Sequence, residues 1–84
     1  MENIFKIQDV FNIGGKTVVS GTLLSGIIKV QMKTNINGKS CPVVAIERGI
    51  KSLDYCDEVN SQINLVLDNV SKEEVQSYDT LIFE

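Results

Sequence analysis

The sequence predicts an all-β fold, a small closed antiparallel β-barrel of six or seven strands with one short helical turn before the last strand. Short runs rich in β-branched and aromatic residues recur along the chain, and two residue pairs containing glycine suit two-residue hairpin turns. Strands do not alternate with long helical patterns, which argues against an α/β sheet. Closure into a barrel removes the exposed edges that a small open sheet would leave.

The first predicted strand covers residues 4–13. Counting in steps of two places four large apolar residues on one face, which we expect to point into the core: Phe5, Ile7, Phe11 and Ile13. Asp9 interrupts this face, and a β-bulge there would re-aim one side chain. Gly14-Gly15 follows, and a glycine pair accepts the positive φ angles of a two-residue turn into a second strand over residues 16–23.

A second hairpin is predicted in the middle of the chain. Residues 27–36 carry β-branched side chains and are expected to form one strand, and Asn37-Gly38 after them is the strongest hairpin signal in the sequence. The partner strand then covers residues 39–47. Pro42 has no amide hydrogen to donate to a neighbouring strand, so we expect it near a sheet edge or a bulge.

Two further strands are predicted near the C-terminus, over residues 62–67 and 80–83. Period-two counting in the first of them turns three residues inward: Ile63, Leu65 and Leu67. Between the strands, Ser71-Lys72-Glu73-Glu74 matches a capping box, in which the Ser71 side chain accepts from the Glu74 amide and the Glu74 side chain reaches back. Val70 and Val75 have the spacing of a hydrophobic staple, so a helix of one or two turns is expected.

Length and composition predict one domain over residues 1–84, with no cofactor and no metal. A chain of this size forms one core, and no apolar run approaches the ~20 residues of a membrane-spanning helix. The N-terminus lacks the features of a secretory signal, so a cytoplasmic protein is expected. Histidine is absent, and Cys41 and Cys56 are too few for a zinc site or a disulfide framework. We expect two reduced thiols that help to fill the core.

The motifs of catalysis and nucleotide binding are missing, and we expect a protein that is not an enzyme and does not bind GTP. Gly15-Lys16-Thr17 is similar to the end of a P-loop, but Val10 stands where that motif needs a glycine and a strand follows instead of a helix. A hydrolase or transferase using carboxylates stays an alternative because acidic residues cluster in residues 54–58 and at Glu73-Glu74. Such clusters are more often solvated loops or helix starts.

Charge is divided unevenly along a chain whose net charge is -3. Residues 1–51 contain seven Lys or Arg and three Asp or Glu, whereas residues 52–84 contain one Lys and eight Asp or Glu. The first part therefore suggests a basic patch, made of Lys29, Lys33, Lys39, Arg48 and Lys51. Nucleic-acid binders usually add exposed aromatic residues, and only Tyr55 and Tyr78 are candidates, because the three phenylalanines fit core positions.

Residues 9–30, DVFNIGGKTVVSGTLLSGIIKV, resemble the opening strands of the second domain of elongation factor Tu and related translational GTPases. The similarity resumes in three later segments: residues 44–47, 51–54 and 70–75. The resemblance implies a six- or seven-stranded barrel, here expected to stand free of a GTPase domain. It also implies that Glu47 occupies the place of the family's glutamate near the terminal adenosine of tRNA, whereas Ile50 replaces an arginine of that site. Gln31 stands where the family commonly has glycine.

The function expected from these observations is that of a non-catalytic binding module that engages a protein or ribonucleoprotein partner. The alternative is direct binding of RNA, either a tRNA end or ribosomal RNA, through the basic patch. The candidate partner- or RNA-binding residues are Glu47, Arg48, Lys51, Lys29, Lys33 and Lys39. Phosphate contacts by such cations would make RNA binding weaken as salt rises.

Overall fold

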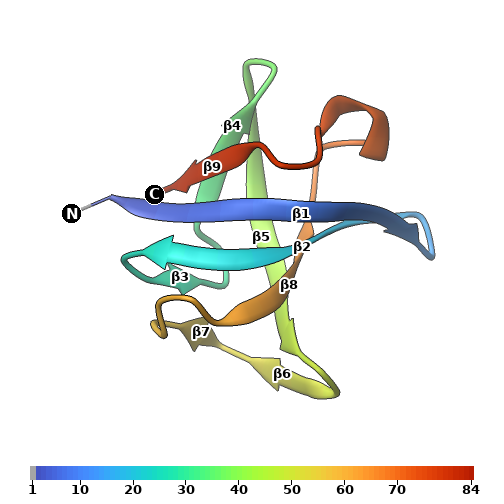
Figure 1. Cartoon of the computed structure of the whole chain (residues 1–84). Helices are drawn as coiled ribbons and strands as arrows, with labels where there is room; N and C mark the ends of the chain where they lie inside the picture. Colours follow the sequence, from blue (N-terminus) through green and yellow to red (C-terminus); the bar gives the residue numbers. More distant parts are fainter. Residues whose placement is uncertain (1) are drawn as a thin grey trace.

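The computed structural model describes residues 2–84, and their secondary structure is almost entirely short strands (Figure 1). In chain order the elements are β1 (Asn3–Ile13), β2 (Lys16–Ser25), β3 (Ile28–Lys29), β4 (Lys33–Ile36), β5 (Lys39–Arg48), β6 (Lys51–Leu53), β7 (Tyr55–Cys56), β8 (Gln62–Leu67), the 3₁₀ turn η1 (Lys72–Glu74) and β9 (Thr80–Phe83). None of the helical segments in residues 2–84 is long and apolar enough to cross a membrane.

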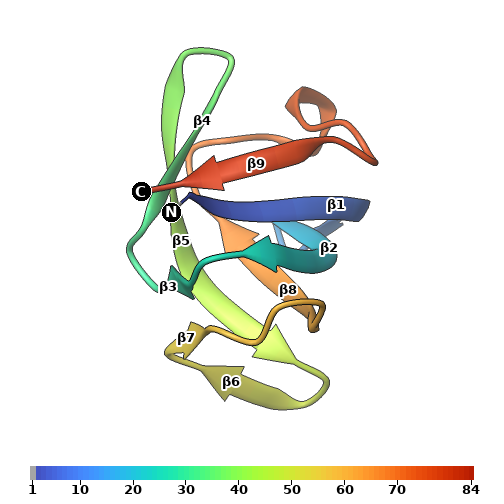
Figure 2. The ribbon, with the colours of Figure 1, turned by 60° about the vertical axis from the view of Figure 1, so that its left-hand side comes forward.

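Six strands close into an antiparallel barrel, as the sequence predicts. Their order around the barrel is β4-β9-β1-β2-β8-β5, and β5 pairs with β4 to complete the ring. Strand β6 pairs with the far end of β5 as an additional edge strand, and β3 and β7 form a separate two-stranded ribbon (Figure 1 and Figure 2). The barrel end at which β5 finishes therefore also carries β6 and β7.

Both predicted two-residue hairpins are confirmed. Ile13 pairs with Lys16 around Gly14 and Gly15, whose φ angles are 59° and 81°. The β4–β5 turn has the same form, with φ angles of 54° at Asn37 and 78° at Gly38. Two consecutive positive φ angles define the turn type whose twist matches paired strands, which is why glycine and asparagine are needed there.

The core lies inside the barrel and is filled mainly by alternate residues of the long strands. Strand β8 turns Ile63, Leu65 and Leu67 inward as predicted, and each is at most 2% exposed. Cys41 and Cys56 are both buried and unbridged, so they fill the core as free thiols. Pro42 immediately precedes a register shift between Val43 and Ala45 in the pairing of β5 with β8, which is the bulge position expected for proline.

The prediction that Phe11 and Ile13 point into the core together with Phe5 and Ile7 is wrong. Phe5 and Ile7 are fully buried, but Phe11 is 45% and Ile13 62% exposed. A β-bulge is present where Asp9 suggested one, since the pairing with β2 shifts register between Ile7 and Asp9. The extra residue reverses the alternation, so Val10 faces the core and Asp9, Phe11 and Ile13 face outward.

The single strand predicted over residues 27–36 is also wrong, because the chain turns sharply in its middle. Gln31 has a φ angle of 83°, which separates β3 from β4. The turn is held by backbone bonds to β5, in which the Gln31 amide donates to the Val43 carbonyl and the Val43 amide donates to the Met32 carbonyl. A left-handed residue at this position explains why glycine is common there in the family that the sequence resembles.

The predicted helix is a single 3₁₀ turn, and its predicted capping box is not formed. Ser71 makes no side-chain cap, and its backbone carbonyl accepts from the Glu74 amide instead. The Glu74 carboxylate forms an ion pair with Lys39, whose Nζ lies 2.6 Å from Oε2 and 2.7 Å from Oε1. Val70 and Val75 both pack against the core, as the staple spacing suggested.

Replacing Thr17 by valine is expected to destabilise the fold by about 1–2 kcal/mol, because a buried carbonyl would lose its partner. Thr17 is 3% exposed, and its Oγ1 donates to the Val70 carbonyl at 2.7 Å, which anchors the segment leading into η1. Valine keeps the shape but not the donor. Urea unfolding followed by circular dichroism measures the change, and Thr17→Ser, which keeps the hydroxyl, is the control that should recover most of the loss.

Candidate functional site

Three of the six predicted site residues lie together at the end of the β5–β6 hairpin. Glu47 and Arg48 are the last two residues of β5, and Lys51 is the first residue of β6, paired with Arg48. Gly49, with a φ angle of 60°, begins the two-residue turn between them, and Ile50 completes it. The short turn keeps both basic side chains at the same end of the barrel.

The other three predicted residues are divided between this end and the far end. Lys29 on β3 pairs with Tyr55 on β7, so it lies near the β5–β6 hairpin. Lys33 on β4 and Lys39 at the start of β5 belong to the β4–β5 hairpin, and Lys39 is engaged by Glu74. Because Lys39 and Arg48 stand at opposite ends of the ten-residue strand β5, the five basic residues do not form one patch.

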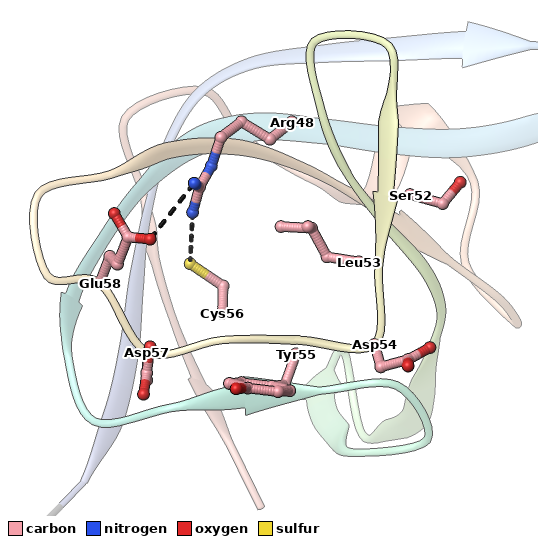
Figure 3. A pocket seen from close by; sticks show the side chains of 8 residues that line it. All are labelled: Arg48, Ser52, Leu53, Asp54, Tyr55, Cys56, Asp57 and Glu58. Atoms are coloured by element: carbon pink, nitrogen blue, oxygen red, sulfur yellow. Dashed lines mark hydrogen bonds and ion pairs between the residues drawn. The ribbon is translucent and has the colours of Figure 1, made fainter.

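Arg48 holds the segment after β6 against the barrel (Figure 3). Its Nη1 lies 3.3 Å from Glu58 Oε1, and its Nη2 donates to the Cys56 thiol sulfur at 3.8 Å. The hydrogen bond to Cys56, followed by the charge of Glu58, raises the pKa of Arg48 above its ordinary value. The guanidinium therefore stays charged and links three elements that are separate in the sequence.

A pocket of about 310 Å³ opens beside Arg48, and Figure 3 shows the side chains around it. Arg48 and Glu58 lie on one side, and Tyr55 and Asp54 lie across from them. The remaining lining residues are Ser52, Leu53, Cys56 and Asp57. Sites for apolar small molecules are lined mainly by apolar side chains, whereas the lining of this pocket is mostly polar and charged.

Ile50 is the most exposed apolar residue of the same hairpin. It is fully exposed in the turn, directly between Gly49 and Lys51. A single exposed apolar side chain is ordinary on a protein surface. Here it is carried by a two-residue turn beside the pocket, so the barrel end combines a protruding apolar contact, an aromatic side chain at Tyr55 and charged groups.

The charge of this barrel end is mixed and slightly acidic. Its carboxylates are Glu47, Asp54, Asp57 and Glu58, and its cations are Lys29, Arg48 and Lys51. One of these cations, Arg48, is already paired with Glu58. Lys29 and Lys51 form no ion pair within residues 2–84, so these two cations are the ones at this end that are available to contact phosphate groups.

The two thiols and the acidic groups give little support for a metal site. Within residues 2–84, histidine, cysteine, aspartate and glutamate side chains form no group of three that could hold a metal ion. Cys56 contacts Arg48, and Cys41 donates to the Lys39 carbonyl at 3.4 Å. Both sulfurs therefore have structural partners inside the barrel.

Alkaline pH is expected to destabilise the fold through Cys41. Burial is the main cause that raises the pKa of this thiol in the folded state. The neutral thiol is therefore favoured in the folded protein, so its contribution is complete below the unfolded pKa of about 8.5 and is lost as the pH rises through the higher folded pKa. Urea unfolding at several pH values checks this, and Cys41→Ala should show a smaller loss of stability above about pH 8.5 than the wild type.

Several features of this site have no signal in the sequence. The contact of Arg48 with Cys56 and Glu58 joins residues eight and ten positions apart across a turn and a short strand. The pocket is lined by residues of β6, β7 and the segment after them, and the position of β7 is set by its pairing with the distant strand β3. The basic residues and Tyr55 could be named from the sequence, but their division between two barrel ends could not.

Comparison with solved structures finds the same fold in translation elongation factor SelB from Methanococcus maripaludis, in its apo crystal form, with a TM-score of 0.84. The match covers 98% of this chain and 18% of that chain, at 21% sequence identity. This chain thus corresponds to a small part of that protein's length, and the likeness confirms the elongation-factor-like barrel fold that the sequence resemblance implied. No family model matches the sequence. No curated protein matches it either.

Proposed function

We propose that this translation-factor-like barrel is a non-catalytic, cytoplasmic binding module that engages a protein, alone or within a ribonucleoprotein, through its β5–β6 end. The observation that carries the proposal is the fully exposed Ile50 in the hairpin turn beside the Arg48–Tyr55 pocket. Protein interfaces combine a few apolar or aromatic anchors with a polar rim. Ile50 and Tyr55 would supply the anchors, and Glu47, Arg48 and Lys51 the rim.

A protein partner fits this end better than RNA does. The local carboxylates outnumber the cations, and Arg48 is already paired with Glu58. Lys39 stands at the other end of β5 and is paired with Glu74, so it adds no phosphate contact here. Glu47 is exposed at the end of β5 and suits an interface rim as well as a contact to a nucleotide.

The proposal is tested by capturing partners from lysate of the source organism with the immobilised protein and identifying both protein and RNA. An Ile50→Ser/Lys51→Glu variant should lose the specific protein, with an affinity for the repurified partner weaker by about tenfold or more in calorimetry. An Ile82→Ser/Lys72→Glu variant is the matched control, since it makes the same types of change at exposed positions on β9 and η1. Equal binding by both variants contradicts the proposal.

RNA binding is distinguished by its salt dependence. If the captured species is RNA, its affinity should fall steeply between low and physiological salt, with a slope set by the number of phosphates neutralised. Association of a tRNA or ribosomal RNA fragment that weakens in this way, and that is lost in a Lys29→Glu/Lys51→Glu variant, would replace the protein proposal by the RNA alternative. Absence of salt-sensitive association with these fragments excludes that alternative.

A further inference from the structure

The two glycine-containing hairpin turns of the barrel share one sequence pattern. Residues 12–16 read Asn-Ile-Gly-Gly-Lys and residues 35–39 read Asn-Ile-Asn-Gly-Lys, so they differ only at the third position, which is Gly14 in one and Asn37 in the other. Both turns contain two consecutive positive φ angles. Asn37 is also the only asparagine in the sequence that is followed by glycine. The turn between β4 and β5 therefore carries a side-chain amide that the turn between β1 and β2 lacks.

An asparagine followed by glycine is the pair of residues best suited to spontaneous deamidation. Asparagine is a thermolabile residue, and glycine adds no side chain that would hinder attack by its own backbone nitrogen. In this reaction the Gly38 nitrogen loses its proton to hydroxide and forms a bond to Asn37 Cγ. The bond from Cγ to the side-chain nitrogen breaks, and that nitrogen takes a proton from water and leaves as ammonia. Water then opens the succinimide ring at either carbonyl, which gives aspartate or isoaspartate.

The turn formed by Asn37 and Gly38 is open to water and hydroxide. Both residues are exposed, and Figure 1 and Figure 2 show the turn as the projecting tip of the β4–β5 hairpin. A Cβ atom placed on Gly38 would meet nothing within 4 Å, so the described part of the chain does not cover this residue. The reacting groups are therefore accessible in the folded protein.

The proton that must leave the Gly38 nitrogen is held by the side chain of Asn35. The Gly38 amide donates to Asn35 Oδ1 at 3.0 Å, and this hydrogen bond stabilises the protonated amide. The first turn has the same bond, in which the Gly15 amide donates to Asn12 Oδ1 at 3.2 Å. Both asparagines therefore hold their turn in the same way, but only Asn35 holds an amide that can attack a neighbouring side chain.

We propose that Asn37 is a deamidation site of this protein, and that the Asn35 side chain slows the reaction by holding the Gly38 amide. Asn35 is a positioning residue, since it acts through the amide and takes no part in the bonds that form and break. The inference does not depend on the proposed function, because this turn and the β5–β6 hairpin lie at opposite ends of the ten-residue strand β5.

The isoaspartate product is expected to weaken the attachment of β4. In isoaspartate the main chain runs through the side-chain carbon, which adds one backbone atom to a turn that sets Ile36 beside Lys39. Thr34 and Ile36 of β4 are buried, so this strand contributes to the core. Among the described residues β4 pairs with β9 at Thr34 and Phe83 alone, so it depends on the turn for much of its position.

The first test follows deamidation of the folded protein at neutral pH by peptide mass spectrometry, with circular dichroism to verify folding. Asn35→Ala should deamidate at Asn37 about three- to tenfold faster than the wild type, a factor that corresponds to one hydrogen bond. Asn35→Asp keeps an acceptor for the Gly38 amide and should stay near the wild-type rate. Asn12→Ala is the matched control, since it removes the equivalent bond from the other turn and should leave the rate unchanged. Asn37→Gly should abolish the reaction at this turn.

The second test measures amide hydrogen exchange by NMR, because exchange and deamidation both require the Gly38 nitrogen to lose its proton. Asn35→Ala should speed exchange at Gly38 by a factor similar to that for deamidation and leave exchange at Gly15 unchanged. Asn12→Ala should do the reverse. A general loosening of the fold would speed exchange at both turns, so this comparison separates the local hydrogen bond from a loss of stability.

The third test compares products after prolonged incubation. The isoaspartyl fraction, separated by chromatography, should unfold at lower urea concentration than an Asn37→Asp variant, which has the same charge but an unchanged backbone. Equal stability of the two would exclude the expected effect on β4.

Any of three results would overturn the proposal. The first is a folded wild type in which Asn37 stays intact for as long as its peptide in urea needs to deamidate completely. The second is an Asn35→Ala variant that deamidates no faster than the wild type. The third is equal acceleration by Asn35→Ala and Asn12→Ala, which would show that the bond to the Gly38 amide has no specific effect.

Discussion

A Gly21→Ala variant is expected to lose roughly 3 kcal/mol of stability, at the upper end of the usual cost of adding a methylene to a packed site. Gly21 lies in β2 and pairs with Ile7 on the neighbouring strand β1. A Cβ atom at Gly21 would stand 1.9 Å from the Lys6 carbonyl oxygen. The same atom would stand 3.0 Å from Phe5 Cζ. The oxygen belongs to the backbone of a paired strand, so relief requires β1 to move rather than a side chain to rotate.

The control for this prediction is Gly14→Ala in the β1–β2 turn. A Cβ atom at Gly14 meets nothing within 4 Å, so alanine there costs only the strain of a positive φ angle, about 1 kcal/mol. Urea unfolding measures the free energy of unfolding of both variants, which reports a steric clash for Gly21→Ala and an unfavourable φ angle for Gly14→Ala. A Gly21→Ala protein as stable as Gly14→Ala would show that β1 and β2 are not held as closely at this point as the structure indicates.

The parts of the fold that sequence predicted correctly depend on residues close together in the chain. Gly14-Gly15 and Asn37-Gly38 set the turns, because their backbone conformations are decided locally. The alternation in β8 was readable because no bulge interrupts it between Gln62 and Leu67. Once these hairpins were placed, short strands without long helices left few arrangements other than a barrel.

The predictions that failed depend on contacts between distant residues. The sequence suggests a bulge near Asp9 but does not indicate which residues face inward after it, so the prediction that Phe11 lies in the core is wrong. The capping box failed because Glu74 pairs with Lys39, which precedes it by 35 residues. Gln31 adopts a left-handed conformation although glutamine gives no sign of it, since the turn is imposed by bonds to β5.

The sequence predicts which residue types the candidate site contains but not how they are arranged in space. Arg48 and Lys51 are conspicuous as basic residues, but the sequence does not indicate that Arg48 is bound by Cys56 and Glu58. The sequence also groups Lys39 with these residues, whereas the structure places it at the other end of β5. Sequence shows how many charges a chain has, whereas the curvature and closure of the barrel decide which of them share a surface.

A Phe5→Ala variant is expected to lose about 3–5 kcal/mol, the usual cost of removing a buried phenylalanine side chain. Phe5 is fully buried between β1 and the core and fills the space above Gly21. A domain of this length has a total stability of about 4–12 kcal/mol, from the usual stability per residue, so at the lower end of this range the variant is expected to be largely unfolded at room temperature. Thermal and urea unfolding measure the loss, and Phe5→Leu should retain a folded core if alanine does not.

Phe11→Ala is the matched control, because it makes the same chemical change on the same strand. Phe11 is 45% exposed, so less of its surface is transferred from water on folding than for the fully buried Phe5, and the loss should be smaller, about 1–2 kcal/mol. If the two variants were destabilised equally, the bulge at Ile7 and Asp9 would not reverse the faces of β1, and Phe11 would belong to the core after all.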